Sequence, residues 1–401
     1  MRFVRLVLLV ALLAAWSLAA SPTAALAAPA ALTGNQYCPT GTIERVGVFD
    51  TGAKWLICLP PGPFWNGDLV VFAHGYTPVT APLDFQSLKV PAPGGGVIDV
   101  PQVVTGLGYA FATTSYRVNG LAVLEGVKDV KQLSLFFPEV AQRRAAHTYL
   151  AGFSEGALVA TLSLEASPNV YSGALAACGP IGDFQKQTNY LGDFRVLFDV
   201  FYPNVLPPTA IKIPPILMAN WYAAPPPQPS YTQKIAAALV GNPANAQQLI
   251  ATSQAAVDPL VQQTIGETTI GVLWYNAFAT NDATAKLGGN PFDNSQKVYV
   301  DPLNTPQFNA LLNQNVARFS ESPKASLSMR KYQTSGQLTR RLVTLHNTAD
   351  PIVPYWHEGL YQAKVQASGA GSWLTPMTVN RYGHCNFTLP EVLAAFQALV
   401  K

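Results

Sequence analysis

Charged residues are scarce in this chain. Asp, Glu, Lys and Arg make up 12% of its 401 residues, about half of the roughly 25% that is usual in soluble domains. The 25 basic and 22 acidic residues leave a net charge of +3, and no stretch gathers basic residues into a stripe that could follow phosphates. We therefore expect no nucleic-acid partner. Disorder is also excluded, because disordered chains are poor in aromatic residues and this chain has 10% of them.

Motifs for cofactors and metals are lacking as well. The sequence contains neither GxGxxG nor GxxxxGK[ST], it has no HExxH, and its five histidines are scattered. We expect neither a nucleotide cofactor nor a metal ion. The sequence has no repeat of 20 to 50 residues, so it does not indicate a solenoid or a propeller.

The N-terminal residues have the pattern of a secretory signal peptide. Arg2 and Arg5 form a short positive region, residues 6–20 are apolar, and Ala25-Leu26-Ala27 is typical of a cleavage site. A membrane anchor needs about 20 apolar residues, and Pro22 interrupts the segment too early. The sequence predicts a signal peptide over residues 1–27, cleavage near Ala27, and a secreted protein without stable membrane insertion.

Only four cysteines are present, and all follow the predicted cleavage site. An even number in an exported protein favours disulfides over a metal site. Four cysteines allow three pairings, and the sequence alone does not choose among them. Cys38 and Cys58 bracket a predicted hairpin, which favours pairing these two.

Short apolar runs alternate with helical patterns in two parts of the chain. Such runs, bounded by turn residues, are typical of strands buried in a parallel sheet. We predict a hairpin over 43–58, strands over 68–73, 110–115, 148–151 and 172–178, and helices over 121–146 and 157–162.

This alternation stops between Asp183 and Gly336, where the chain is rich in Ala, Pro, Asn and Gln and has several helix-like stretches. It resumes with strands over 341–345 and 373–379 and helices over 356–367 and 391–401. The sequence therefore predicts an α/β fold with a mostly parallel sheet flanked by helices. Its core comprises residues 36–183 and 336–401, and residues 184–335 form a mostly helical lid insertion.

A candidate nucleophile lies in Gly152-Phe153-Ser154-Glu155-Gly156, which matches G-x-S-x-G between a predicted strand and a predicted helix. A sharp turn there lifts the hydroxyl of Ser154 clear of the sheet, and larger residues in place of the glycines would clash. The turn also directs the N-terminus of the helix at the reacting centre, where it stabilises negative charge. We predict Ser154 as a nucleophile.

A serine hydroxyl needs a base, which follows it in the order Ser, acid, His in this type of fold. His74 and His147 precede Ser154, His346 ends a predicted strand ahead of any suitable acid, and His357 lies in a predicted helix. His384 lies in a loop after the last predicted strand, where a base can reach over the carboxyl edge of the sheet. We predict His384 as the base.

The predicted acid is Asp350, in the loop that follows the strand at 341–345. A carboxylate there can accept the Nδ1–H of the base and stabilise the imidazolium formed during attack. Asp258 and Asp301 also precede prolines but belong to the insertion, and Glu358 belongs to the following helix.

An oxyanion hole needs two backbone N–H groups. In such a site one comes from the residue after the nucleophile, Glu155, and the other from the loop after the third strand, where His74-Gly75-Tyr76 lies. Gly75 permits close approach of the backbone, and Tyr76 is the predicted second donor.

In chain order, HGY at a strand end, GFSEG, HNTADPIVP after a strand and a final GHC loop resemble the α/β-hydrolase superfamily, in particular secreted bacterial enzymes of the esterase type. The resemblance implies an α/β-hydrolase fold and a serine hydrolase. Prolyl-oligopeptidase-type peptidases share the catalytic order, but a propeller or long N-terminal domain precedes it there. Only about 40 residues lie between the cleavage site and the first core strand here.

A comparison with tannases and fungal-type feruloyl esterases bears on the other two cysteines. Those enzymes join a cysteine before the nucleophile to one after the histidine. This sequence keeps the second, Cys385, but has Phe153 at the first place. Cys178, at the end of the strand after the nucleophile helix, is predicted on the same sheet edge and can clamp the His384 loop instead.

The predicted activity is hydrolysis of hydrophobic or aromatic carboxylic esters, small or polymer-borne, through an acyl-enzyme. A peptidase or amidase with the same triad, an acyltransferase and a non-catalytic binding protein on the same scaffold remain alternatives, and the oligomeric state stays open. The insertion can act as a lid, and we expect few of its aromatic residues to face the substrate. These residues are Phe194, Phe198, Phe201, Tyr202, Trp221, Tyr222, Tyr231, Trp274, Tyr275 and Phe278.

Overall fold

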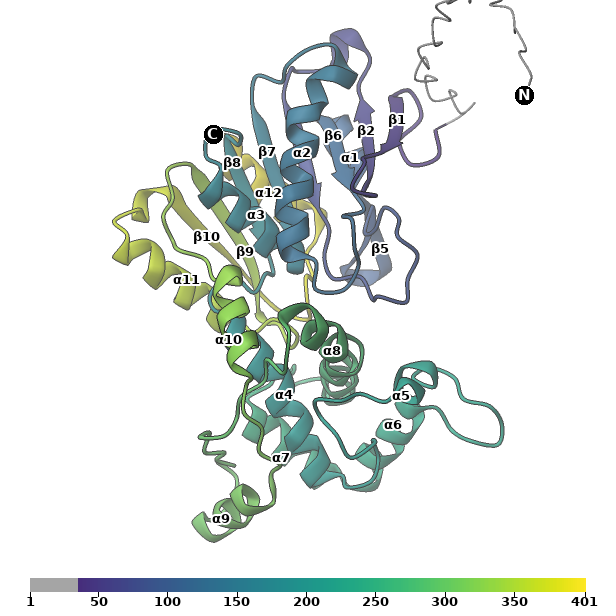
Figure 1. The fold of residues 1–401 in the computed structure, drawn as a ribbon, viewed down its shortest axis with the longest axis vertical. Helices are drawn as coiled ribbons and strands as arrows, with labels where there is room; N and C mark the ends of the chain where they lie inside the picture. The colour runs from purple at the N-terminus through teal and green to yellow at the C-terminus, as the bar shows by residue number, and fades with distance from the viewer. Residues whose placement is uncertain (1–34) are drawn as a thin grey trace, which may run out of the picture. The chain divides into compact units, whose positions relative to one another are not determined.

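An eight-stranded sheet with the order β1-β2-β6-β3-β7-β8-β9-β10 organises the chain (Figure 1). The computed structural model describes residues 35–401, so the predicted signal peptide lies outside the described residues. The strands are β1 (Ile43–Val48), β2 (Lys54–Leu59), β3 (Leu69–Ala73), β6 (Ala110–Thr114), β7 (Thr148–Phe153), β8 (Gly173–Ala177), β9 (Arg341–Ala349) and β10 (Leu374–Tyr382).

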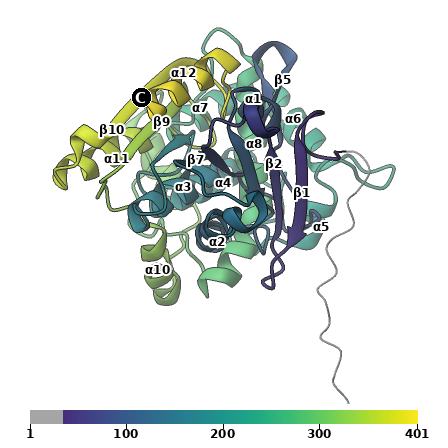
Figure 2. The same cartoon turned by 90° about the horizontal axis from the view of Figure 1, so that it is seen from above.

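Strand direction identifies the fold. β2 pairs antiparallel with both β1 and β6, whereas all pairs from β6 to β10 are parallel. Figure 2 shows β1 and β2 at one side of the molecule and β9 and β10 at the other, as the strand order requires. A mostly parallel sheet with this order and an antiparallel second strand is the α/β-hydrolase fold, and it confirms the predicted fold class.

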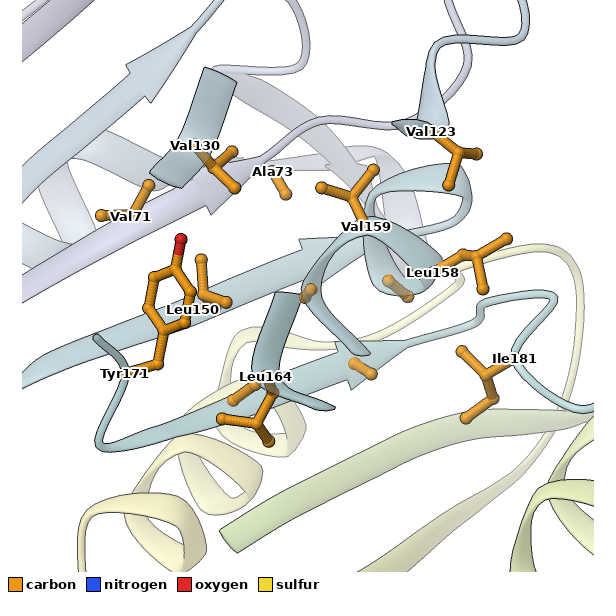
Figure 3. Close-up of a cluster of buried hydrophobic side chains, with 14 of the residues drawn as sticks. Val71, Ala73, Val123, Val130, Leu150, Leu158, Val159, Leu164, Tyr171 and Ile181 are labelled. Carbon is orange, nitrogen blue, oxygen red and sulfur yellow. The ribbon is translucent and has the colours of Figure 1, made fainter. Parts of the chain in front are cut away.

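Helices cover both faces of the sheet, because successive strand residues point to opposite sides. Val71 of β3 and Leu150 of β7 pack with α2, α3 and α11, whereas Phe72 of β3 packs on the opposite side with α1 and α12. Figure 3 shows side chains of the first cluster, including Leu164 of α3. The helices are α1 (Val100–Gly106), α2 (Val123–Ala141), α3 (Glu155–Ala166), α11 (Trp356–Ala367) and α12 (Leu389–Val400).

The insertion lies between β8 and β9 and contains seven α-helices in the described structure. It has an apolar core of its own, which includes Phe194 and Trp221, and this core continues onto Ile352 and Val353 of the loop after β9. The insertion therefore packs directly on the loop that carries Asp350. Its helices are α4 (Phe184–Phe201), α5 (Pro215–Ala219), α6 (Tyr231–Gly241), α7 (Pro243–Ser253), α8 (Gln263–Leu287), α9 (Pro306–Asn315) and α10 (Pro323–Met329).

Several features differ from the sequence-based expectation. Helix α1 was not predicted, and β10 continues three residues beyond the predicted end at residue 379. β9 continues four residues beyond the predicted end at residue 345, because His346 and Asn347 pair with β10 and are buried. A two-stranded hairpin, β4 (Lys89–Ala92) with β5 (Gly96–Asp99), was not predicted at all. No helix within residues 35–401 has the length and apolarity needed to cross a bilayer.

Candidate active site

Ser154 lies at a sharp turn between β7 and α3. Its φ of 56° and ψ of −125° are unusual for a residue with a side chain. The turn depends on its glycines: a Cβ on Gly152 would lie 2.0 Å from the carbonyl oxygen of Gly156, and one on Gly156 would lie 2.0 Å from that of Ala73. The G-x-S-x-G sequence is thus required by close backbone approach, and the turn holds the Ser154 hydroxyl at the end of the strand.

A chain of hydrogen bonds joins the three residues selected from the sequence. His384 Nε2 lies 2.8 Å from Ser154 Oγ, and His384 Nδ1 lies 2.7 Å from Asp350 Oδ2. These residues come from the ends of β7, β9 and β10, and 230 positions separate the serine from the histidine. In this arrangement the imidazole can take a proton from the serine while the carboxylate holds its tautomer.

Asp350 is fully buried at the first position after β9. Its Oδ1 accepts hydrogen bonds from the amides of Ile352 and Val353, which leaves Oδ2 for His384. Burial alone would raise the pKa of Asp350, but the nearby His384 and His346 outweigh it and hold the pKa below its usual value. The carboxylate therefore stays ionised.

A second buried acid–histidine pair lies behind Asp350. His346 Nδ1 is 3.0 Å from Glu358 Oε1, and the other oxygen of Glu358 accepts a hydrogen bond from Thr344. His346 Nε2 lies 2.9 Å from the carbonyl oxygen of Val353 and 3.6 Å from Asp350 Oδ2. Burial alone would lower the pKa of His346, but the bonds and charges of Asp350 and Glu358 outweigh it and raise this pKa well above its usual value. The sequence did not predict that His346 and Glu358 form a pair, because only the extension of β9 and the packing of α11 bring them together.

The two predicted oxyanion donors lie beside Ser154. Glu155 is the first residue of α3, and its amide, like that of Tyr76, has no hydrogen-bond acceptor within residues 35–401. A Cβ on Gly75 would lie only 3.1 Å from the Cβ of Ser154, so the loop before Tyr76 approaches the nucleophile closely. The Tyr76 hydroxyl donates to the carbonyl of Phe278, which anchors its side chain on α8.

His74 positions the peptide that carries the Tyr76 amide. Burial lowers the pKa of His74, so its ring is neutral, and its Nδ1 lies 2.7 Å from the carbonyl oxygen of Gly75. Because a carbonyl only accepts, Nδ1 carries the proton and donates. Fixing the C=O of a trans peptide also fixes its N–H, which points the opposite way.

The structure contains two disulfides, Cys38–Cys58 and Cys178–Cys385, the pairs favoured from the sequence. Cys178 follows β8 and Cys385 follows His384. The second disulfide therefore links the loop that carries His384 to the end of β8, the strand beside the nucleophile. The sulfurs of Cys178 and Cys385 and a ring nitrogen of His384 lie within 4.8 Å of one another. Because the sulfurs are bonded to each other, this group is no metal site.

A cavity lies beside Ser154, with about 900 Å³ of empty space that includes open solvent. Its wall is mostly apolar and combines core residues, such as Leu121 and Ile352, with insertion residues, such as Ala283. We call it the cap cavity. Of the ten insertion aromatics named above, only Tyr275 lines it within the described structure, in line with the expectation that few would face a substrate.

Glu155 places a carboxyl group in the wall of the cap cavity. Its Oε1 accepts a hydrogen bond from the amide of Ala122. Burial raises the pKa of Glu155 to about 8, and the bond from Ala122 opposes this shift only in part. At neutral pH the side chain is therefore mostly uncharged, which suits an apolar cavity beside a site where negative charge develops.

The substitution Glu155→Gln is expected to preserve activity at alkaline pH. In the unmodified protein, kcat/KM on a neutral ester should fall above about pH 8 and reach about a tenth of its maximum near pH 9, because the ionised carboxylate opposes the oxyanion. A rate profile from pH 6 to 10 measures this. The exposed Glu139→Gln serves as the control and should keep the alkaline fall. An unchanged fall in Glu155→Gln would contradict the assignment.

Among known proteins, only solved structures are found to be similar to this chain. No protein-family model and no curated protein matches this chain. An esterase from Pseudomonas putida aligns with a TM-score of 0.42 and 13% identity over 90% of this chain and 82% of its own. A Pyrococcus furiosus esterase aligns with a TM-score of 0.43 and 10% identity over 89% and 88%.

The acylaminoacyl peptidase of Pyrococcus horikoshii aligns with a TM-score of 0.42 and 11% identity over 86% of this chain. The chain spans 38% of the length of that peptidase. All three of these solved proteins are hydrolases by name. At this level of similarity, the chemistry is argued from the geometry of the site.

Proposed function

We propose that the protein is a secreted serine hydrolase of carboxylic esters that works through an acyl-enzyme. The hydrogen-bonded series from Ser154 through His384 to Asp350 at the mouth of an apolar cavity carries this proposal. A buried, ionised Asp350 supports the role of the acid, and the constrained backbone of Ser154 supports that of the nucleophile.

In this mechanism Ser154 Oγ attacks the ester carbonyl while His384 Nε2 accepts its proton. The amides of Tyr76 and Glu155 stabilise the oxyanion of the tetrahedral intermediate. His384 then gives the proton to the departing alcohol oxygen, which leaves the acid bound to Ser154. Water, deprotonated by His384, attacks this acyl-enzyme and releases the acid.

The cap cavity favours an uncharged, apolar acid. Lys and Arg are absent from its lining within the described residues, and its single carboxyl group, on Glu155, is mostly neutral at pH 7. A charged acyl group would lose its hydration there without gaining a partner of opposite charge. Aliphatic and aromatic acids fit this wall.

Two disulfides support secretion, because such bonds persist in oxidising compartments. The signal peptide predicted over residues 1–27 would direct the export.

Parallel assays on p-nitrophenyl esters and p-nitroanilide peptides test the proposed activity. We expect turnover of neutral esters, with kcat/KM higher for butanoate or longer acids than for acetate, and slower or no turnover of anilides. Faster cleavage of anilides would instead identify a peptidase or amidase. A transfer product that outweighs hydrolysis when an alcohol is added would identify an acyltransferase.

A further inference from the structure

Two hollows meet at the nucleophile. Tyr76, Ser154 and Tyr275 line the cap cavity and also line a second hollow, with about 640 Å³ of empty space that includes open solvent. The β4–β5 hairpin, including Val90, and the loop that carries His384 bound this second hollow. An ester whose carbonyl carbon lies at Ser154 Oγ therefore has one group directed into each hollow.

The positions of His384 and Glu155 distinguish the two sides. His384 lines the second hollow and does not line the cap cavity, whereas Glu155 lines the cap cavity and not the second hollow. The departing oxygen receives its proton from His384, so it must lie within hydrogen-bonding distance of that ring. This requirement places the alcohol in the second hollow and the acid in the cap cavity.

An entirely apolar space lies next to the second hollow, between α1 and α12, with about 570 Å³ of empty volume that includes open solvent. The two spaces share the side chains of Val90, Ile98, Phe153 and Val392. We call them together the hairpin chamber. Phe153, directly before the nucleophile, is part of their common wall.

The hairpin chamber contains no group that would suit a charged or strongly hydrated alcohol. Apart from the catalytic Ser154 and His384, its side-chain polar groups are the hydroxyls of Ser87, Tyr76 and Tyr275, all in the part nearest the nucleophile. Lys, Arg, Asp and Glu are absent from the lining of both spaces within residues 35–401. A sugar or glycerol headgroup would exchange its many hydrogen bonds to water for at most those to these three hydroxyls.

We propose that the alcohol released by this enzyme is apolar, alkyl or aromatic, and that the β4–β5 hairpin binds it against α12, so that the substrates carry apolar groups on both sides of the ester. This inference rests on the proposed function. In the first step a bond forms between Ser154 Oγ and the carbonyl carbon, the bond from that carbon to the alcohol oxygen breaks, and the serine proton passes through His384 to the alcohol.

Esters of one acid with alcohols of different length test this assignment. For butanoates of methanol, butanol and octanol, measured by pH-stat titration below their solubility limits, kcat/KM should rise about tenfold or more from methyl to octyl. A fully buried methylene contributes about fourfold. The octyl-to-methyl ratio in the unmodified protein is itself a test that needs no variant.

Three tryptophan variants locate the alcohol. Val90→Trp fills the shared wall of the hairpin chamber and should reduce the octyl-to-methyl ratio to within about twofold of one. Val97→Trp, on the same hairpin but with an exposed side chain that lines neither space, should keep the ratio. Ala283→Trp fills the cap cavity and should reduce the preference for octanoate over acetate among methyl esters, with the alcohol ratio unchanged.

The outcomes separate this inference from the proposed function. Hydrolysis with an octyl-to-methyl ratio near one in the unmodified protein overturns the apolar-alcohol assignment alone. So does a Val90→Trp variant that loses selectivity for the acid instead of the alcohol. Absence of ester hydrolysis together with absence of a covalent phosphonate adduct on Ser154 overturns the proposed function and this inference with it.

Discussion

Replacing Ser154 with alanine is expected to lower kcat/KM for ester hydrolysis by about 10⁴-fold or more. The residual rate comes from the oxyanion donors and substrate binding, which the variant keeps. The fold should be unaffected, because the Ser154 side chain makes its hydrogen bond to His384 and does not cap α3. Initial rates on a p-nitrophenyl butanoate, with circular dichroism to confirm folding, measure the effect.

Ser163 provides a control in α3, the helix that follows Ser154. Its hydroxyl is buried and has no hydrogen-bond partner within the described structure. Ser163→Ala should therefore keep full activity, so that a loss seen in Ser154→Ala reflects chemistry and not the removal of a serine hydroxyl as such. Retention of more than about a hundredth of the activity in Ser154→Ala would exclude this residue as the nucleophile.

Replacing Glu358 with leucine is expected to reduce the free energy of unfolding by about 3–5 kcal/mol at pH 6. Breaking a buried ion pair costs about this much, because His346 would keep only the more distant Asp350, 3.6 Å away, as an acidic partner. Here the remaining groups are His346, whose Nδ1 lies 3.0 Å from Glu358, and the hydroxyl of Thr344. Urea unfolding with both disulfides intact gives the free energy, and the exposed Glu139→Gln should change it by less than about 0.5 kcal/mol.

The pH dependence of stability identifies the cause of that loss. The pKa of His346 is higher in the folded protein than in the unfolded chain, where it is about 6.5. Its contribution is therefore fully present below that pH and is lost as the pH rises toward the folded value. The unmodified protein should lose stability from pH 6.5 upward, and Glu358→Leu should lose less over the same range. Parallel curves for the two proteins would rule out a charged His346.

Local sequence selected candidate residues for the site more readily than the residues that support them. G-x-S-x-G at a strand–helix junction selected Ser154, and chain order then selected Asp350 and His384, which the structure brings within hydrogen-bonding distance. Strong local constraints explain why the serine could be selected, because its flanking glycines are required by backbone contacts under 3 Å.

The features missed depend on distant packing. His346 and Asn347 are polar and follow an apolar run, so the sequence indicated a loop, yet pairing with β10 extends β9 through both. The β4–β5 hairpin was hidden by Pro91, Pro93 and the glycines at 94–96, which are typical of loops. The packing of the insertion on the loop that carries Asp350 decides which insertion residues line the cap cavity. Local periodicity in the sequence does not encode this packing.

The identity of the nucleophile is tested most directly by mass spectrometry of the protein after reaction with a p-nitrophenyl alkylphosphonate. The account predicts one added phosphonyl group, located on Ser154 by peptide mapping and absent from Ser154→Ala, with ester hydrolysis lost in proportion to labelling. Labelling of another residue, or labelling that persists in Ser154→Ala, would contradict it.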